Sequence, residues 1–373
     1  MDKPLIPVTR RHFMLKMGAL LLTLKVANSV ANTDNWACWA GAAKQGNDYW
    51  LMFIDARGQV VRKIKLPSRA HGLQQSAQGQ LIICGRRPGS WLGLFQHPKA
   101  QPQWINAAPN RPLSGHCCFS PNGHLFFSAE NALDMGQGVI GIWHSQSGQR
   151  LSEWLSHGVG PHEILISQDR MHLWVANGGI LTHPDHGREK LNLNTMNSNM
   201  SCLSLINGGL SQQYTIEEPK LSMRHIAINQ HEQVAVACQY QGPVHLRKNL
   251  LLLISEGQIK YLSCEPAVMV NLNNYLGSVT FDRSGMWIGA SSPRGNRVVI
   301  WHLINGLEPI HYDTLAITDA CGLSASNEKG GFIISTGMGY LYHYLATTKD
   351  LSIMAPDVGT YTQFNWDNHL TSL

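Results

Sequence analysis

Histidine recurs along this chain at intervals that indicate one equivalent position in a repeated unit. His71, His116 and His162 are separated by 45 and 46 residues, and His225 follows after 63. Imidazole is a common ligand of transition metals, and a carboxylate such as that of Glu163 can complete a ligand set. Because repeats place equivalent positions near one another, these side chains are expected to share one small volume. The candidate metal ligands are His71, His116, His162, Glu163 and His225, and the expected cofactor is a transition metal, iron or copper.

These histidines belong to a short pattern that returns seven times. Its opening residues are followed by a few apolar residues, a tight turn such as 120–123, and a second apolar run such as 125–127. Self-similarity of this size is typical of a solenoid, a propeller or an array. The opening pairs are His71-Gly72, His116-Cys117, His162-Glu163, Arg224-His225, Gly277-Ser278, Cys321-Gly322 and Asn368-His369.

The third repeat shows the structure of one unit. Strands are predicted over 117–120, 125–128, 138–144 and 150–156, with Ser147-Gly148 as the turn between the last two. Short strands rich in β-branched and aromatic residues, divided by Gly, Asn and Pro turns, indicate a four-stranded antiparallel sheet. A series of such sheets, spaced as the histidines are, predicts a β-propeller.

The two ends of the chain are predicted to close the ring together. Residues 36–40 resemble a second strand, 49–55 a third and 60–66 a fourth, with no first strand before them. The C-terminal segment 364–369 is expected to supply this missing innermost strand, which removes exposed sheet edges. The expected fold class is therefore all-β: a seven-bladed propeller of four-stranded antiparallel blades, forming a single domain over residues 32–373.

One face of this propeller is expected to carry the chemistry. Antiparallel order places the opening residues and the loops after second strands on the same face. An insertion near 181–201 emerges there and contains His183 and His186; it is interpreted as a lid over the channel, with a solvated loop as the alternative. Arginines on this face suit a carboxylate or phosphate, and carboxamide and carboxylate side chains suit a divalent ion. The candidate cofactor-binding residues are Arg86, Arg87, Glu130, Asn131, Asn177, Arg224 and Arg294.

The histidines also have a structural interpretation. Aligning the second strands puts His116 and His225 at one position, and His71 and His162 one residue earlier. Neighbouring strand residues point to opposite sides, so only half of the four are expected to face the axis. The alternative to a ligand site is that these histidines bind backbone groups of adjacent blades and tie the sheets together.

The N-terminal residues are predicted to be an export signal. Thr9-Arg10-Arg11-His12-Phe13-Met14-Leu15 resembles the twin-arginine motif, and the weakly apolar stretch 17–27 is too short and polar to span a bilayer. Cleavage is expected after Ala31, which makes residues 1–31 the signal peptide. The alternative is an ordinary secretory signal containing two arginines. The mature protein is expected to be periplasmic, exported folded, and without a membrane anchor.

Composition narrows the function classes further. The formal net charge of +5 is modest, and no basic cluster indicates nucleic-acid binding. Of the eight cysteines, Cys38, Cys84 and Cys238 fall where other repeats carry small residues, which predicts free buried thiols, while one disulfide among the other five stays open. No motif of a common hydrolase, kinase or haem protein is present.

Several of these segments together resemble the DUF1513 family. They are Arg69-Ala70-His71-Gly72, Gly85-Arg86-Arg87-Pro88-Gly89, residues 158–163, residues 176–184, residues 221–225, residues 291–295 and Trp366-Asp367-Asn368-His369. The resemblance implies an exported bacterial propeller of the YVTN or quinoprotein amine dehydrogenase β-chain type. It also implies a role in periplasmic iron handling beside imelysin-like and di-haem oxidase-like proteins, with no known reaction. The strand 139–143 lacks the acidic residue expected of the family.

Three functions follow from these observations. The first is a non-catalytic periplasmic protein that binds a metal ion or metal-containing ligand at the channel mouth and is associated with iron uptake. The second is an interaction scaffold in which the histidines are purely structural. The third is a propeller enzyme, such as a lactonase or a dehydrogenase subunit.

Overall fold

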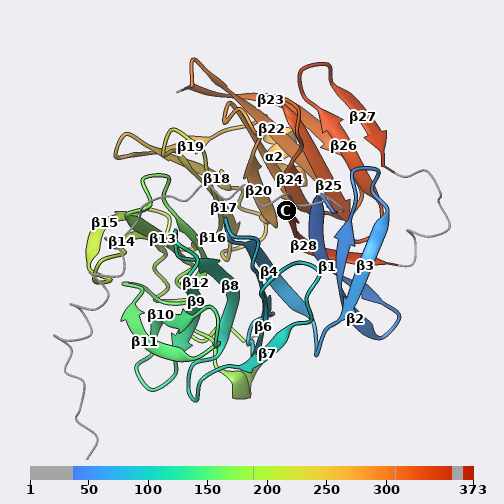
Figure 1. Cartoon of the computed structure of the whole chain (residues 1–373). Helices are drawn as coiled ribbons and strands as arrows, with labels where there is room; N and C mark the ends of the chain where they lie inside the picture. Colours follow the sequence, from blue (N-terminus) through green and yellow to red (C-terminus); the bar gives the residue numbers. More distant parts are fainter. Residues whose placement is uncertain (1–36, 188, 307, 355–363) are drawn as a thin grey trace, which may run out of the picture.

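Each repeat of the sequence forms one antiparallel sheet, and the seven sheets are arranged in a ring around a central axis (Figure 1). The computed structural model describes residues 37–187, 189–306, 308–354 and 364–373. Within these residues every sheet has four strands, so the predicted all-β, seven-bladed fold is confirmed. The predicted export signal, including Ala31, lies outside the described residues.

The strands follow one another in chain order within each blade. The first two complete blades are β4 (Ala70–Gln75), β5 (Leu81–Gly85), β6 (Trp91–Phe95) and β7 (Gln103–Asn106), followed by β8 (Leu113–Phe119), β9 (Leu125–Ala132), β10 (Gln137–His144) and β11 (Arg150–Leu155). The next two are β12 (Pro161–Ile166), β13 (His172–Asn177), β14 (Asn199–Ser204) and β15 (Leu210–Thr215), followed by β16 (Leu221–Ile228), β17 (Val234–Tyr240), β18 (Leu251–Ser255) and β19 (Gln258–Leu262). Two further blades are β20 (Ser278–Phe281), β21 (Trp287–Ser292), β22 (Arg297–Ile304) and β23 (Glu308–Ala316); and β24 (Ala320–Ala325), β25 (Gly331–Thr336), β26 (Leu341–Leu345) and β27 (Asp350–Ile353).

The seventh blade joins the two ends of the described chain, as predicted. Strand β28 (Asn365–Ser372) pairs antiparallel with β1 (Trp39–Gln45), and β2 (Asp48–Ile54) and β3 (Val60–Lys65) complete the sheet. Strand β1 begins three residues later than the sequence pattern suggested, at Trp39 rather than residue 36. This pairing covers the inner edge of β1, which would otherwise be exposed, and completes the seventh blade.

Burial follows the order of the strands in each blade. Every residue of β8 and β9 is buried, whereas β15 is almost entirely exposed. The inner strands are covered by neighbouring blades on both faces, and the fourth strands form the outer rim. Cys84 and Cys238 are fully buried in second strands, as predicted. The prediction of a buried thiol is wrong for Cys38, which is only partly buried because it lies just before β1. All eight cysteines are free thiols.

Two connections carry helical turns. The segment 178–198 between β13 and β14 contains η1 (Pro184–His186), and Asn192 fixes its base by donating to the Gly179 carbonyl at 2.9 Å. The helix α2 (Pro266–Asn271) connects β19 to β20. Among the described residues, no helix has the length and apolarity needed to cross a bilayer.

Candidate functional site: a histidine cluster at the propeller axis

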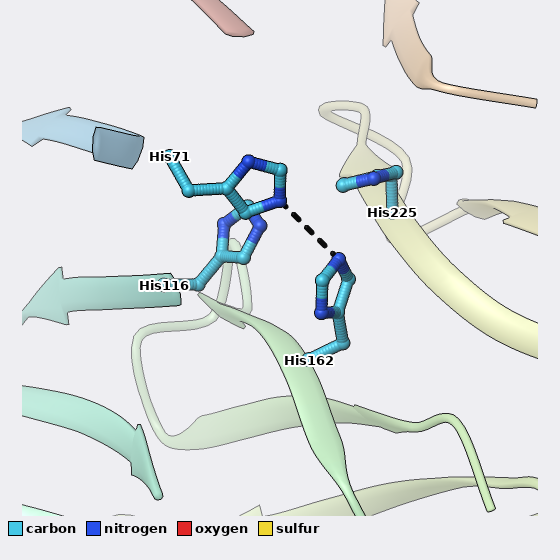
Figure 2. Close-up of side chains that lie close together, drawn as sticks. All are labelled: His71, His116, His162 and His225. Carbon is cyan, nitrogen blue, oxygen red and sulfur yellow. Dashed lines mark hydrogen bonds between the residues drawn. The ribbon is translucent and has the colours of Figure 1, made fainter. Parts of the chain in front are cut away.

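Four histidines from the innermost strands of consecutive blades meet in the central channel. His71 lies on β4, His116 on β8, His162 on β12 and His225 on β16, and Figure 2 shows their rings turned toward one another. The six distances between their ring centroids range from 4.8 to 5.7 Å. Six nearly equal separations describe a tetrahedron rather than a flat ring. Each residue is less than 9% exposed.

β-Bulges bring all four side chains to the axis, although strict alternation predicted only half of them. Three residue steps along β4 span two along β5 between Ala70 and Leu73, which places His71 inside a bulge. Similar register shifts occur at 113–117 on β8, 161–164 on β12 and 223–225 on β16. A bulge bends its strand and redirects a side chain. The expectation that half would point away is therefore wrong, because it assumed regular strands.

Two glycines allow the His71 and His116 rings to approach each other. A Cβ atom on Gly115, whose φ is 111°, would lie 2.8 Å from Cδ2 of His71. A Cβ atom on Gly72 would lie 2.7 Å from the Gly115 carbonyl oxygen and 2.8 Å from Nδ1 of His116. Contacts this short do not occur between real side chains, so both positions require glycine.

The nitrogen atoms at the centre have the spacing of a coordination sphere. Nε2 of His71 lies 3.5 Å from Nε2 of His162, which is long for an N–H···N hydrogen bond (Figure 2). Zinc–imidazole bonds of about 2.0–2.1 Å give tetrahedral nitrogen–nitrogen edges of about 3.3–3.4 Å. One ligand atom from each of the four histidines lies within 4.8 Å of the other three. A small contraction would therefore bring four nitrogens onto one metal ion.

Two carboxylates lie behind the imidazoles. Oε2 of Glu163 is 3.2 Å from Nδ1 of His225, and Oε1 is 3.5 Å from Nδ1 of His116. Nδ1 of His71 is 3.7 Å from Oδ1 of Asp367. Carboxylates in this position fix the ring orientation of metal-binding histidines and raise their basicity.

The charges of the carboxylates differ. Burial raises the pKa of Glu163 to about 7, although the neighbouring His369 ring and the hydrogen bond from the Ile226 amide act in the opposite direction. Burial also acts against ionisation of Asp367, but His71 and Arg69 hold the pKa of Asp367 well below its ordinary value. Arg69 donates from Nε to Asp367 at 2.5 Å.

The imidazoles are neutral near pH 7. Burial lowers the pKa of His71 to about 4, and burial together with the Arg224 charge lowers the pKa of His225 to about 3. The pKa values of His116 and His162 are lowered in the same direction, chiefly by burial. Neutral imidazole is the form that binds metal, so proton competition is weak.

The sequence pattern missed two members of this cluster. His369 on β28 lies with its ring centroid 4.5–4.6 Å from those of His71, His116 and His225, and Asp367 on the same strand contacts His71. The pair Asn368-His369 was recognised as the seventh opening of the repeat, and its histidine was the available signal. Its place among the ligands depends on ring closure.

The predicted cofactor-binding residues divide into two groups. Arg86 lies beside the cluster, with Nη1 3.7 Å from Oδ2 of Asp367. The pKa of His162 is lowered first by burial, then by His225 and by the Arg224 charge, so Arg224 also lies near the cluster. Glu130, in contrast, pairs with Arg150 at 2.7 Å inside its own blade.

The remaining predicted residues are occupied within loops or blades. Asn131 donates to Ser114 Oγ, and Asn177 donates to the carbonyl of Ser156 and to Asn199. The guanidinium of Arg294 lies over the Tyr275 ring, and Arg87 is half-buried in the loop after β5.

The insertion contributes a separate histidine pair. His183 and His186 have ring centroids 6.0 Å apart, and their side chains are 37% and 55% exposed. No described contact joins them to the channel cluster. A lid function for this segment stays a prediction.

Comparison with known proteins supports the fold and identifies the family. Hydrazine synthase of Kuenenia stuttgartiensis is similar over 89% of this chain and 99% of that chain, with a TM-score of 0.57 and 13% identity. A functionally unknown protein from Desulfotomaculum acetoxidans is similar over 89% and 98%, with a TM-score of 0.58 and 8% identity. Identities this low show a shared fold alone, and the search of curated proteins found no match. The model of the family described as protein of unknown function (DUF1513) matches residues 64–373, so the chain belongs to the DUF1513 family.

Proposed function

We propose that this protein binds a transition-metal ion at the four-imidazole centre formed by His71, His116, His162 and His225. It acts as a non-catalytic protein of the periplasm, is exported folded by the twin-arginine route, and serves iron uptake or handling. Its partners are then periplasmic iron-handling proteins of the imelysin-like and di-haem oxidase-like types.

The observation that carries this proposal is the hydrogen bonding of the histidines. Histidines that tie blades together would hydrogen-bond to backbone groups of an adjacent blade. Within the described residues, none of the imidazole side chains of His71, His116, His162 and His225 makes such a bond. Nε2 of His116, the ring nitrogen that does not face Glu163, is buried with no hydrogen-bond partner in the described chain. Leaving one buried polar atom unpaired destabilises the folded protein by about 1–3 kcal/mol. The four imidazole rings share one volume, so a single ion can contact all of them. A bound metal ion supplies the interaction that the protein alone does not.

The donor set limits the identity of the ion. Four neutral imidazoles suit iron, copper, zinc and nickel, and disfavour calcium or magnesium, which require oxygen ligands. Among divalent first-row metals, copper(II) binds such nitrogen sites most tightly, but in the cell the availability of each metal also decides which ion occupies the site. Iron follows from the family resemblance, so iron and copper are the two metals proposed.

Metal content of the exported protein tests the proposal. The mature protein is purified without a histidine tag and analysed by elemental mass spectrometry, beside the His116→Ala/His162→Ala variant. We expect near-stoichiometric iron or copper in the parent and its loss in the folded variant.

A matched control removes two exposed histidines instead. The His183→Ala/His186→Ala variant should keep the metal content of the parent. Equal metal loss in this control would assign the metal to the insertion. A parent protein that takes up no iron, copper or zinc, even after reconstitution, would overturn the proposal and favour the scaffold function.

A further inference from the structure

A second set of ligand atoms lies next to the four-imidazole centre. Atoms of His116, Glu163, His225 and His369 all lie within 4.8 Å of one another. Two edges of this set join Glu163 to Nδ1 of His225 and to Nδ1 of His116, at 3.2 and 3.5 Å. Tetrahedral coordination with bonds of about 2.0–2.1 Å has edges of about 3.3–3.4 Å. One oxygen and three nitrogens are therefore arranged at metal-ligand spacing.

His116 and His225 belong to both sets, and each imidazole has two nitrogens. Their Nδ1 atoms face Glu163, which leaves Nε2 for the four-imidazole centre. Nε2 of His116 is buried with no hydrogen-bond partner in the described chain. One ring can hold a metal ion on each nitrogen after its N–H proton has been released to solvent. The two sets therefore do not compete for the same atoms.

The two positions differ in access to water. The Glu163 side chain is 15% exposed and His369 is half-buried, whereas the four histidines of the first centre are at most 8% exposed. The mixed position thus lies nearer to solvent than the four-imidazole centre.

We infer that the channel holds two metal ions, bridged by His116 and His225. One ion is bound by the four imidazoles, and the other by Glu163, His369 and the outer nitrogens of the two shared rings. This inference rests on the proposed metal binding. The carboxylate of Glu163 and the two deprotonated rings offset the charge of the second cation. Ring geometry and the bond lengths above place the two ions roughly 6 Å apart.

Copper titration of the metal-free protein tests the inference. The His183→Ala/His186→Ala background removes the exposed pair that would bind copper adventitiously. In this background, His162→Ala removes a ligand of the first position only, and His369→Ala a ligand of the second position only. After gel filtration, bound copper is counted by elemental analysis, and electron paramagnetic resonance reports coupling between the ions.

The inference is supported by two copper ions in the background protein, one in each of the His162→Ala and His369→Ala variants, and none in the variant that combines His162→Ala with His369→Ala. The bridged pair should also show a copper resonance weaker than its copper content, with full intensity restored in each single variant. One copper in the background protein, unchanged by His369→Ala, would overturn the second position and leave the proposed function standing. No copper in the background protein would overturn both. Should His369→Ala fail to fold, His369→Gln replaces the same ligand with less loss of volume, and Glu163→Gln replaces the other ligand that belongs to the second position alone.

Discussion

Metal binding at the axis should raise the thermal stability of the protein by a calculable amount. A ligand at 100 times its dissociation constant stabilises the folded state by about 2.7 kcal/mol. The ring spans residues 37–373, and an unfolding entropy of about 2.1 cal/mol/K per residue over roughly 340 residues gives about 0.7 kcal/mol/K. The midpoint of unfolding, Tm, should therefore rise by about 4 °C.

The perturbation that tests this value is His162→Ala. Its ring nitrogen is 3.5 Å from that of His71, so its loss removes one corner of the tetrahedron. The metal-free protein and the variant are each melted with and without Zn²⁺, with circular dichroism as the signal. We expect the shift in the parent and almost none in the variant, each compared with its own metal-free melt.

Zn²⁺ is chosen because it has no redox chemistry that would damage the protein on heating. The His183→Ala/His186→Ala variant is the control and should show the full shift. An equal shift in His162→Ala and in the parent would refute the reasoning, because the stabilising ion would then be bound elsewhere.

Three other changes have defined outcomes. Asp367→Asn removes the carboxylate behind His71 and should weaken metal binding 10- to 100-fold in a competition assay with a chelator. The β-sheet content measured by circular dichroism should stay unchanged. Arg150→Ala leaves the fully buried Glu130 without its cation and should lower the free energy of unfolding, measured by urea denaturation, by about 3–5 kcal/mol. The metal content per folded protein should stay unaffected. Loss of metal in this variant would instead place Glu130 in the site. Gly72→Ala forces a methyl group against His116 and should reduce metal affinity although no ligand is removed; unchanged affinity would mean that the close approach of the rings is not needed.

The amino-acid sequence by itself determined the blades and the candidate histidines. Strand and turn patterns are local, and their repetition fixed the number of sheets and the pairing of β28 with β1. Equivalent positions in a closed ring lie near one axis, so His71, His116, His162 and His225 were expected to share one small volume, although regular strand alternation would have turned only half of them to the axis. The recurrence of small buried residues at Cys84 and Cys238 has the same local origin.

Only the tertiary structure decided which polar groups meet at that axis. The bulges in β4, β8, β12 and β16 break the alternation of strand residues, and nothing in the local pattern shows where an extra residue is accommodated. Asp367 reaches Arg69 across 298 residues, a contact that exists only because the ring closes. Glu130 near the end of β9 and Glu163 near the start of β12 were both candidate site residues from the sequence, yet Glu130 pairs with Arg150 within its blade and Glu163 reaches the histidines. Their different roles depend on which neighbouring side chain is within reach, and that is a property of packing between blades.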